Sequence, residues 1–507
     1  MGTRRALMSI LLVTALLLSW TSSEVKADVK NETGYQEAYR PQYHFSPPKN
    51  WMNDPNGLVY YKGEYHLFYQ YNPYGNQWGH MSWGHAVSKD LIRWRHLPVA
   101  LKEDDLGMIF SGSVVVDKHD TSGFFGGKSG LVAIYTSAGE SQQQSIAYSK
   151  DDGRTWHKYK GNPVIPNPGL KDFRDPKVFW DDQTGKWVMV LAAGDRVMFY
   201  SSTNLRNWSY MSQFGADQGA HGGVWECPEL FQLPVEGHPG EKKWVLQVDI
   251  NPGGIAGGSG GQYFVGEFDG KKFTTQQKGI KWVDFGKDFY ATQTWSNTPG
   301  RLIWVAWMNN WQYAQDIPTS PWRGAMSFPR ELSLKKVNGE YVLVQKPVQE
   351  INKLREDTRV WNNRIITPGT ELLPVRGETL EIEAEFQLDT ADEFGLIVRK
   401  GTKEKTIIGY NVGNQTLFVD RTQSGRTDFS KDFPVVTKAQ MKPKNRVIQL
   451  HILVDRSSVE VFGNHGETVL TNQIFPDLKS QGLELYARGG NVKLQTLRIH
   501  RLKSAWQ

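Results

Sequence analysis

Cysteine is almost absent from this sequence: among 507 residues, only Cys227 carries a thiol. A disulfide within the chain is therefore impossible, and a structural zinc site, which commonly uses several thiolates, is disfavoured. The folded state must be stabilised by packing instead. A chain of this length can form two or more domains with large buried cores.

Long hydrophobic runs are also missing after the first residues. The opening stretch, MGTRRALMSILLVTALLLSW, joins Arg4 and Arg5 to an apolar segment that is too short to span a bilayer. The tripeptide VKA at 25–27 then offers the small residues of a signal-peptidase site. We predict a signal peptide at residues 1–27 and a secreted (extracellular) protein without membrane contact after its removal. An uncleaved membrane anchor is the alternative.

The chain has no strong charge of either sign, since its formal net charge is +6. So small and evenly spread a surplus does not indicate a nucleic acid or a membrane surface as partner. His66, His80 and His85 lack the spacing of metal ligands with a matching acid, so we expect no metal ion and no cofactor. The sequence does not indicate an oligomeric state. Function must therefore come from local sites.

Helical periodicity is nearly absent from about Tyr43 to Glu331. Short strand-like segments, such as GLVYYKGEYHLFYQY and KVFWDDQTGKWVMVLAAG, are separated there by Gly, Pro, Asn and Asp. This pattern predicts β structure throughout the region.

A turn-like motif repeats in the same region at intervals of roughly 50 to 60 residues. Its copies are SKDLIRW, SKDDGRTW, STNLRNW and the degraded FDGKKF, which begin at Ser88, Ser149, Ser202 and Phe268. A repeat of this length, with several strands per unit, is typical of propeller blades, and the region accommodates about five of them. The second copy resembles the Asp-box turn of other propellers, so we assign the Asp and Trp residues of the repeat to turns. We predict a propeller catalytic domain at 36–345.

The remainder of the chain divides into two parts. Residues 346–360 are compatible with a helical linker. Residues 361–507 again have strand-like alternation, as in HILVD and VEVF, which suits a sheet with one buried face. The predicted fold class is therefore all-β, with a five-bladed β-propeller followed by a C-terminal β-sandwich.

Three acidic residues stand out by their context. Asp54 lies in WMNDPNG, Asp175 in KDFRDPKVFW and Glu226 in GGVWECPELF. A proline follows each acid directly or one residue later, which favours an extended or turn conformation there. Because the inner strands of a propeller converge on one axis, single acids from different blades can meet at one end of it.

Such a meeting of acids has a chemical use. Cleavage of a glycosidic bond needs one carboxylate that attacks or activates water and a second carboxyl group that protonates the leaving oxygen. A third acid could hold sugar hydroxyls through charge-assisted hydrogen bonds. The alternative is that these residues are turn caps. For Asp175, considered by itself, this is the favoured interpretation.

The motifs WMNDPNG, FSGS, RDP and ECP occur in the order and context of glycoside hydrolase family 32, the family of invertases, inulinases and levanases. This sequence resembles that family over nearly the whole chain after the leader. The resemblance implies a five-bladed propeller followed by a β-sandwich. It also implies the hydrolysis of terminal β-fructofuranosides with retention of configuration.

The same resemblance implies a role for each acid. Asp54 would be the nucleophile on the anomeric C2 of fructose. Glu226 would protonate the leaving group and then activate water, and Asp175 would stabilise the oxocarbenium-like transition state by holding ring hydroxyls. Substrate contacts are expected from Trp51, Asn53, Gln70, Trp78, Phe110, Ser111, Arg174 and Trp311. For Trp78, Phe110 and Trp311, simple packing is the alternative.

The expected activity is the release of terminal β-D-fructofuranosyl residues from levan, inulin and sucrose. An endo-levanase, a dedicated invertase and a fructosyltransferase are alternatives within the same family. From another class, a non-catalytic fructan-binding lectin is possible, although three intact acids argue against it. The sequence does not decide between β-2,6 and β-2,1 linkages.

Overall fold

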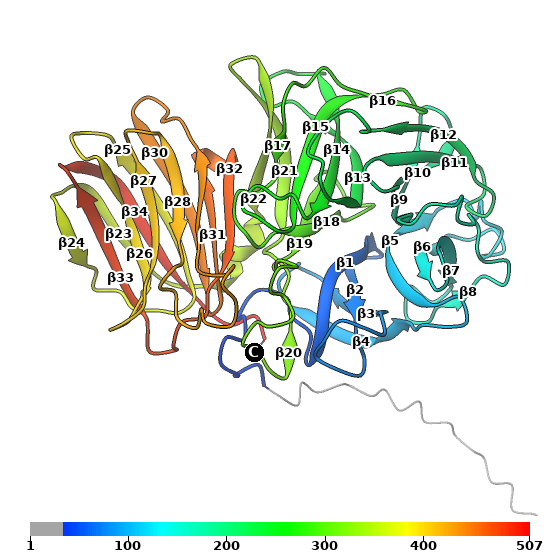
Figure 1. The fold of residues 1–507 in the computed structure, drawn as a ribbon, viewed down its shortest axis with the longest axis horizontal. Coiled ribbons are helices and arrows are strands. Elements are labelled where there is room, and N and C mark those ends of the chain that lie inside the picture. Colours follow the sequence, from blue (N-terminus) through cyan, green and yellow to red (C-terminus); the bar gives the residue numbers. More distant parts are fainter. Residues whose placement is uncertain (1–33, 507) are drawn as a thin grey trace, which may run out of the picture.

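The computed structural model describes residues 34–506, so the predicted signal peptide at 1–27 lies outside the described residues. The chain forms two parts that lie side by side, one coloured blue to green and the other yellow to red (Figure 1). Among residues 34–506 the only helices are two short 3-10 helices, η1 (Gln349–Leu354) and η2 (Asn464–Gly466). No helix among the described residues has the length and apolar character needed to cross a bilayer. The predicted all-β class is confirmed.

The first part consists of antiparallel sheets that follow one another along the chain. The first sheet contains β1 (Asn50–Tyr61), β2 (Glu64–Tyr71), β3 (Ser82–Ser88), β4 (Trp94–Leu101) and the short β20 (Trp322–Arg323), which pairs with β1 in parallel. The second contains β5 (Met108–Asp117), β6 (Gly130–Ala138), β7 (Gln142–Ser149) and β8 (His157–Lys158). The third contains β9 (Arg174–Asp181), β10 (Lys186–Ala192), β11 (Val197–Ser202) and β12 (Ser209–Phe214).

Two further sheets complete this part. One contains β13 (Val224–Pro234), β14 (Lys242–Asn251), β15 (Gly260–Phe268), β16 (Phe273–Thr274) and β17 (Lys281–Trp282). The other contains β18 (Tyr290–Thr294), β19 (Ile303–Trp307), β21 (Arg330–Val337) and β22 (Glu340–Pro347).

The leading strands of these sheets form a closed ring. β1 contacts β5, β5 contacts β9, β9 contacts β13, β13 contacts β18, and β18 contacts β1 again (Figure 1). Apolar side chains fill the space between neighbouring sheets: Val59, Phe68 and Trp83 of the first sheet belong to the same buried cluster as Val114 and Ala133 of the second. A ring of radially arranged sheets of four or five strands is the architecture of a β-propeller.

The repeated motif forms turns, as predicted. In the first copy, the Asp90 amide donates to Ser88 Oγ at 3.1 Å, and Trp94 Nε1 donates to the Leu91 carbonyl at 3.1 Å. The third copy repeats both bonds, from the Asn204 amide to Ser202 Oγ and from Trp208 Nε1 to the Leu205 carbonyl. In the second copy the Ser149 hydroxyl donates to Asp151 Oδ1, and Trp156 Nε1 donates to the Gly153 carbonyl. The Asp and Trp residues of the repeat therefore stabilise the turns at the periphery of the sheets.

The second part is a β-sandwich of two six-stranded sheets. One has the order β23-β34-β25-β30-β31-β32, with bounds β23 (Arg355–Ile366), β25 (Leu380–Gln387), β30 (Val447–Asp455), β31 (Ser458–Gly463), β32 (Thr468–Gln473) and β34 (Val492–Leu502). The other has the order β24-β33-β26-β27-β28-β29, with bounds β24 (Gly369–Leu372), β26 (Glu393–Lys400), β27 (Thr406–Asn411), β28 (Thr416–Asp420), β29 (Val436–Gln440) and β33 (Gly482–Arg488). Ile382 and Phe386 of the first sheet pack with Leu396, Ile408 and Leu485 of the second in one buried core.

The predicted helical linker at 346–360 differs from the structure. Only Gln349–Leu354 are helical, in a 3-10 turn, and strand β23 begins at Arg355. The reason is tertiary, because β23 pairs with β34 from the end of the chain, with Arg355 opposite Leu502.

Buried ion pairs join the propeller to the sandwich. Arg330 of β21 is fully buried and contacts Asp284 at 3.1 Å as well as Glu460 of β31. His44, which precedes the propeller strands, contacts Asp455 and Glu460 at 2.8 Å each. Removal of one partner from such a group would leave an uncompensated buried charge, so the two parts are held in one arrangement.

Candidate active site

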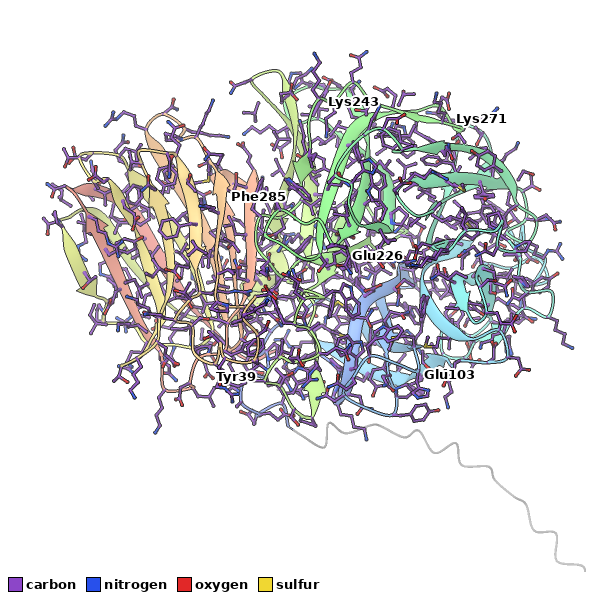
Figure 2. All side chains as sticks on the ribbon, viewed as in Figure 1. Tyr39, Glu103, Glu226, Lys243, Lys271 and Phe285 are labelled. Atoms are coloured by element: carbon purple, nitrogen blue, oxygen red, sulfur yellow. The ribbon has the colours of Figure 1, made fainter. Side chains whose placement is uncertain are left out.

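A pocket of about 280 Å³ lies where the ring strands meet. Figure 2 places Glu226 at this centre, between β1, β9, β13 and β18. The pocket is lined by Asn53, Asp54, Gln70, Trp78, Phe110, Ser111, Gln142, Asp172, Arg174, Asp175, Glu226 and Trp311. All the predicted site residues except Trp51 are therefore brought together in one pocket.

Each ring strand carries a β-bulge where it reaches this centre. The pairing shifts register at residues 52–55 of β1, 109–112 of β5, 174–177 of β9, 226–229 of β13 and 290–293 of β18. In a regular strand, consecutive side chains point to opposite faces, but a bulge redirects one of them. Three pairs of consecutive residues consequently line the same pocket: Asn53 with Asp54, Phe110 with Ser111, and Arg174 with Asp175.

Asp54 is held by donors on both of its carboxyl oxygens. Ser111 Oγ donates to Oδ2 at 2.6 Å, and Asn53 Nδ2 donates to Oδ1 at 3.0 Å. Trp51, which is fully buried, donates from its indole Nε1 to Asn53 Oδ1 at 2.6 Å. Trp51 thus lies beneath the pocket, where it orients Asn53, rather than in the pocket wall where a substrate contact was expected.

Asp175 and Asp54 share a neighbour, Cys227. The Cys227 amide donates to Asp175 Oδ2 at 3.0 Å, and its Sγ lies 3.6 Å from Oδ2 of each aspartate. Asp175 (φ 63°) and Cys227 (φ 47°) both have left-handed backbone conformations, which are uncommon for residues other than glycine. Such strain is concentrated at functional sites, where surrounding structure enforces it.

Glu226 is bound through both carboxyl oxygens as well. Arg174 Nη2 donates to Oε1 at 2.8 Å, and the Tyr290 hydroxyl donates to Oε2. Arg174 also donates to Asp172 Oδ1 at 2.6 Å and lies 3.9 Å from Asp175 Oδ2. One guanidinium group therefore contacts three carboxylates and fixes their relative positions.

Burial and mutual repulsion raise the pKa values of Asp54 and Asp175. Burial raises the pKa of Asp54, although hydrogen bonds from Ser111 and Asn53 partly offset the effect. Burial raises the pKa of Asp175 to about 7; Arg174 lowers it, while the charges of Glu226 and Asp54 raise it further. Burial also raises the pKa of the Cys227 thiol well above its usual value, so the thiol stays protonated.

A possible metal-binding group lies elsewhere. Among residues 34–506, Glu381, Glu383 and His451 of the sandwich place one ligand atom each within 4.8 Å of one another. Arg355, however, donates to both oxygens of Glu381, at 2.6 and 2.7 Å. Glu381 is therefore already paired with an arginine, and the group is not part of the pocket.

Sequence reasoning did not identify four residues of the site. Gln142 and Asp172 line the pocket, while Tyr290 and Cys227 contact its acids from beneath. Asp172 could have been found from its position two residues before Arg174 in KDFRDP. Gln142 and Tyr290 lie in segments without a local signal, because strand pairing alone brings them to the centre.

The chemistry of this pocket is that of a glycosidase. It combines a group of convergent carboxyl groups, which can attack and protonate a glycosidic bond, with amides and aromatic walls suited to a sugar ring. Residues 44–347 match the Glycosyl hydrolases family 32 N-terminal domain, and residues 350–501 match the Glycosyl hydrolases family 32 C terminal. The chain belongs to glycosyl hydrolase family 32, as its motifs predicted.

Known relatives agree with this assignment. A levanase from Bacillus subtilis is 56% identical, over 99% of this chain and 76% of that protein. The crystal structure of an exo-inulinase from Aspergillus awamori superposes with a TM-score of 0.88 at 42% identity, over 93% of this chain and 100% of that one. A fructofuranosidase from Schwanniomyces occidentalis, solved in complex with fructose, has a TM-score of 0.87 at 33% identity, over 93% and 99% of the two chains.

Proposed function

We propose that this protein is a retaining exo-β-fructosidase that releases terminal β-D-fructofuranosyl residues from levan, inulin and sucrose. The observation that carries the proposal is the convergence of Asp54, Asp175 and Glu226, from three different ring strands, in one small pocket. Relatives named levanase, exo-inulinase and fructofuranosidase support the choice of substrate.

The reaction proceeds by double displacement. The Asp54 carboxylate attacks the anomeric C2 of the fructosyl unit while Glu226 gives its proton to the leaving oxygen, so that the glycosidic bond breaks and a fructosyl ester forms on Asp54. Glu226, now a carboxylate, then takes a proton from water, and the resulting hydroxide attacks C2 and releases Asp54. Asp175 accepts hydrogen bonds from ring hydroxyls and stabilises the positive charge that develops in each transition state.

The shape of the pocket supports action at chain ends. Its floor is formed by buried polar side chains, among them Asn53, Gln70 and Ser111, whose exposed fractions are 3%, 2% and 4%. Trp78 at the rim is 38% exposed and lies edge-on to Phe110, with 6.1 Å between the ring centroids. A closed floor admits the terminal unit of a fructan, whereas endo cleavage needs a cleft open at both ends.

We also propose domain boundaries and an extracellular location for the protein. The ring of sheets is interpreted as a five-bladed propeller at 36–345, followed by a short linker that contains η1 and by the β-sandwich, whose first strand begins at Arg355. The boundary between the two family matches, after residue 347, supports this division. Secretion after loss of residues 1–27 is supported by a relative from Aspergillus niger that is named an extracellular exo-inulinase.

Product analysis over a time course on levan, inulin and sucrose tests this function. The expected result is fructose as the first product from both polymers, and no product with the Asp54→Asn variant. Early oligosaccharides would instead indicate endo cleavage or fructosyl transfer. Binding without any product from the three substrates would indicate a lectin.

A further inference from the structure

Strand β18 differs from the other ring strands in its relation to the pocket. It carries the same kind of bulge, yet it supplies none of the residues that line the pocket surface. At its bulge lies Tyr290, which is 1% exposed and donates its hydroxyl hydrogen to Glu226 Oε2. The fifth ring strand therefore acts on Glu226 rather than on a bound sugar.

The backbone after Tyr290 is strained. Ala291 has a φ of 57°, a left-handed conformation that is unfavourable for a residue with a side chain. The next amide, of Thr292, donates to Asp249 Oδ2 at 3.1 Å. This bond fixes the strained turn in the orientation that directs Tyr290 toward Glu226.

Asp249 has no other evident use. It is fully buried on β14, opposite Glu226 in the pairing of β13 with β14. Burial raises its pKa well above the usual range, and hydrogen bonds from Gln247 and from the Thr292 amide offset this only in part. The space for it depends on Gly261, where a Cβ atom would lie 2.6 Å from Asp249 Oδ1. Burying a carboxyl group in this way is costly, which argues for a function.

We propose that Asp249 and Tyr290 are positioning residues of the glycosidase reaction: Asp249 holds the turn at Ala291, and this turn places the Tyr290 hydroxyl on Glu226. The proposal rests on the role assigned to Glu226 above. Tyr290 and Arg174 together hold both Glu226 oxygens, so that the carboxyl group keeps one orientation while it gives up and regains its proton.

Several other ionisable groups surround Glu226. They are Asp54, Asp172, Asp175, Arg174, Cys227, Asp249 and Tyr290. Loss of the Tyr290 hydroxyl would leave Glu226 Oε2 without this donor, so that Arg174 alone would hold the orientation of the carboxyl group.

The test compares kcat and KM of the full-length enzyme and its Tyr290→Phe variant on sucrose. We expect kcat to fall by about tenfold to a hundredfold, with KM almost unchanged because Tyr290 does not contact the sugar. A Tyr290→Phe enzyme with an unchanged kcat, or one whose KM rises instead, would overturn the proposal.

Asp249 is tested by two substitutions. Asp249→Ala removes the acceptor of the Thr292 amide and should reproduce the effects of Tyr290→Phe, whereas Asp249→Asn keeps an acceptor oxygen and should retain most activity. The Asp249→Ala/Tyr290→Phe double variant should be no slower than the slower single variant, since both act through one contact. Equal losses in Asp249→Asn and Asp249→Ala, or additive losses in the double variant, would contradict the proposed chain of contacts.

The controls separate this inference from the proposed function. Melting temperatures identify variants that are merely unstable. If Asp249→Ala fails to fold, Tyr290→Phe and Asp249→Asn still test the proposed positioning role. Failure of the proposed function would appear as an inactive wild-type enzyme. Failure of this inference would appear as an active wild-type enzyme whose variants share its kcat.

Discussion

Arg174 Nη2 lies 2.8 Å from Glu226 Oε1, and this ion pair joins β9 to β13 across the pocket. The same guanidinium contacts Asp172 at 2.6 Å. Its planar group with several fixed N–H donors allows it to bind both carboxylates at once. Arg174 therefore determines the geometry of the acids as well as their charge balance.

Arg174→Lys should show how strongly activity depends on that geometry. The ammonium group keeps the charge but cannot bridge Glu226 and Asp172, so we expect kcat/KM on sucrose to fall by about a hundredfold. Steady-state kinetics provides the measurement. Arg196→Lys is a matched control, because among residues 34–506 Arg196 forms an ion pair only with its exposed neighbour Asp195. Comparable activity in the two variants would contradict the role given to Arg174.

Ser111→Ala should shift the acidic limb of the kcat/KM profile to higher pH. The Ser111 hydroxyl donates to Asp54 and lowers its pKa, so its loss leaves the carboxyl group protonated up to a higher pH. Because the ionised form is the nucleophile, activity at low pH declines first. Ser113→Ala is the control: Ser113 lies on the same strand but donates to the Pro176 carbonyl. An acidic limb that does not move in Ser111→Ala would refute this prediction.

His44 should make folding stability depend on pH. Burial lowers the pKa of His44, but hydrogen bonds to Asp455 and Glu460 outweigh burial and raise the pKa to about 9. The stabilisation, about 3 kcal/mol, is complete below the unfolded value of about 6.5 and is lost as the pH rises through about 9.

This effect can be measured as the change in melting temperature between about pH 6 and about pH 10, a range that spans the titration of His44. His44→Gln should lower the melting temperature at the acidic end and flatten its decline at the alkaline end. In His80→Gln, which removes an exposed histidine paired with Glu103, the wild-type decline should persist. A steep alkaline decline that survives in His44→Gln would rule out this origin.

Cys227 should react slowly with alkylating reagents. Burial and the neighbouring carboxylates Asp175 and Asp54 raise the pKa of its thiol, and only the thiolate is a good nucleophile. Labelling with iodoacetamide at neutral pH, followed by mass spectrometry, should be much slower than labelling of free cysteine. Labelling at the rate of free cysteine would show that the thiol is ionised.

Much of the site could be predicted from sequence because its chemistry lies in short segments. Asp54, Asp175 and Glu226 each stand near a proline within a distinctive motif, and the strand-like alternation predicted an all-β chain. Tyr290 and Gln142 could not be found in this way, since tyrosine and glutamine are common strand residues. Bulged pairing brings Tyr290 to the centre, and regular pairing of β7 with β6 brings Gln142 there.

The remaining differences have physical causes of the same kind. Trp51 has an aromatic side chain of the kind that stacks on sugars, but its indole is buried and donates a hydrogen bond to Asn53. The amino-acid sequence of residues 346–360 is compatible with a helix, but the pairing of β23 with β34 overrides this local helical preference. In both cases, contacts with distant segments decide the outcome.

Trapping the covalent intermediate tests the proposed mechanism itself. In Glu226→Gln the second step lacks its base, so β-fructosyl fluoride, whose leaving group needs no protonation, should fructosylate the enzyme faster than water can release the sugar. Peptide mass spectrometry should find one fructosyl unit on the peptide that contains Asp54. A fructosyl unit on any other residue, or turnover to fructose of inverted configuration without an adduct, would contradict double displacement through Asp54.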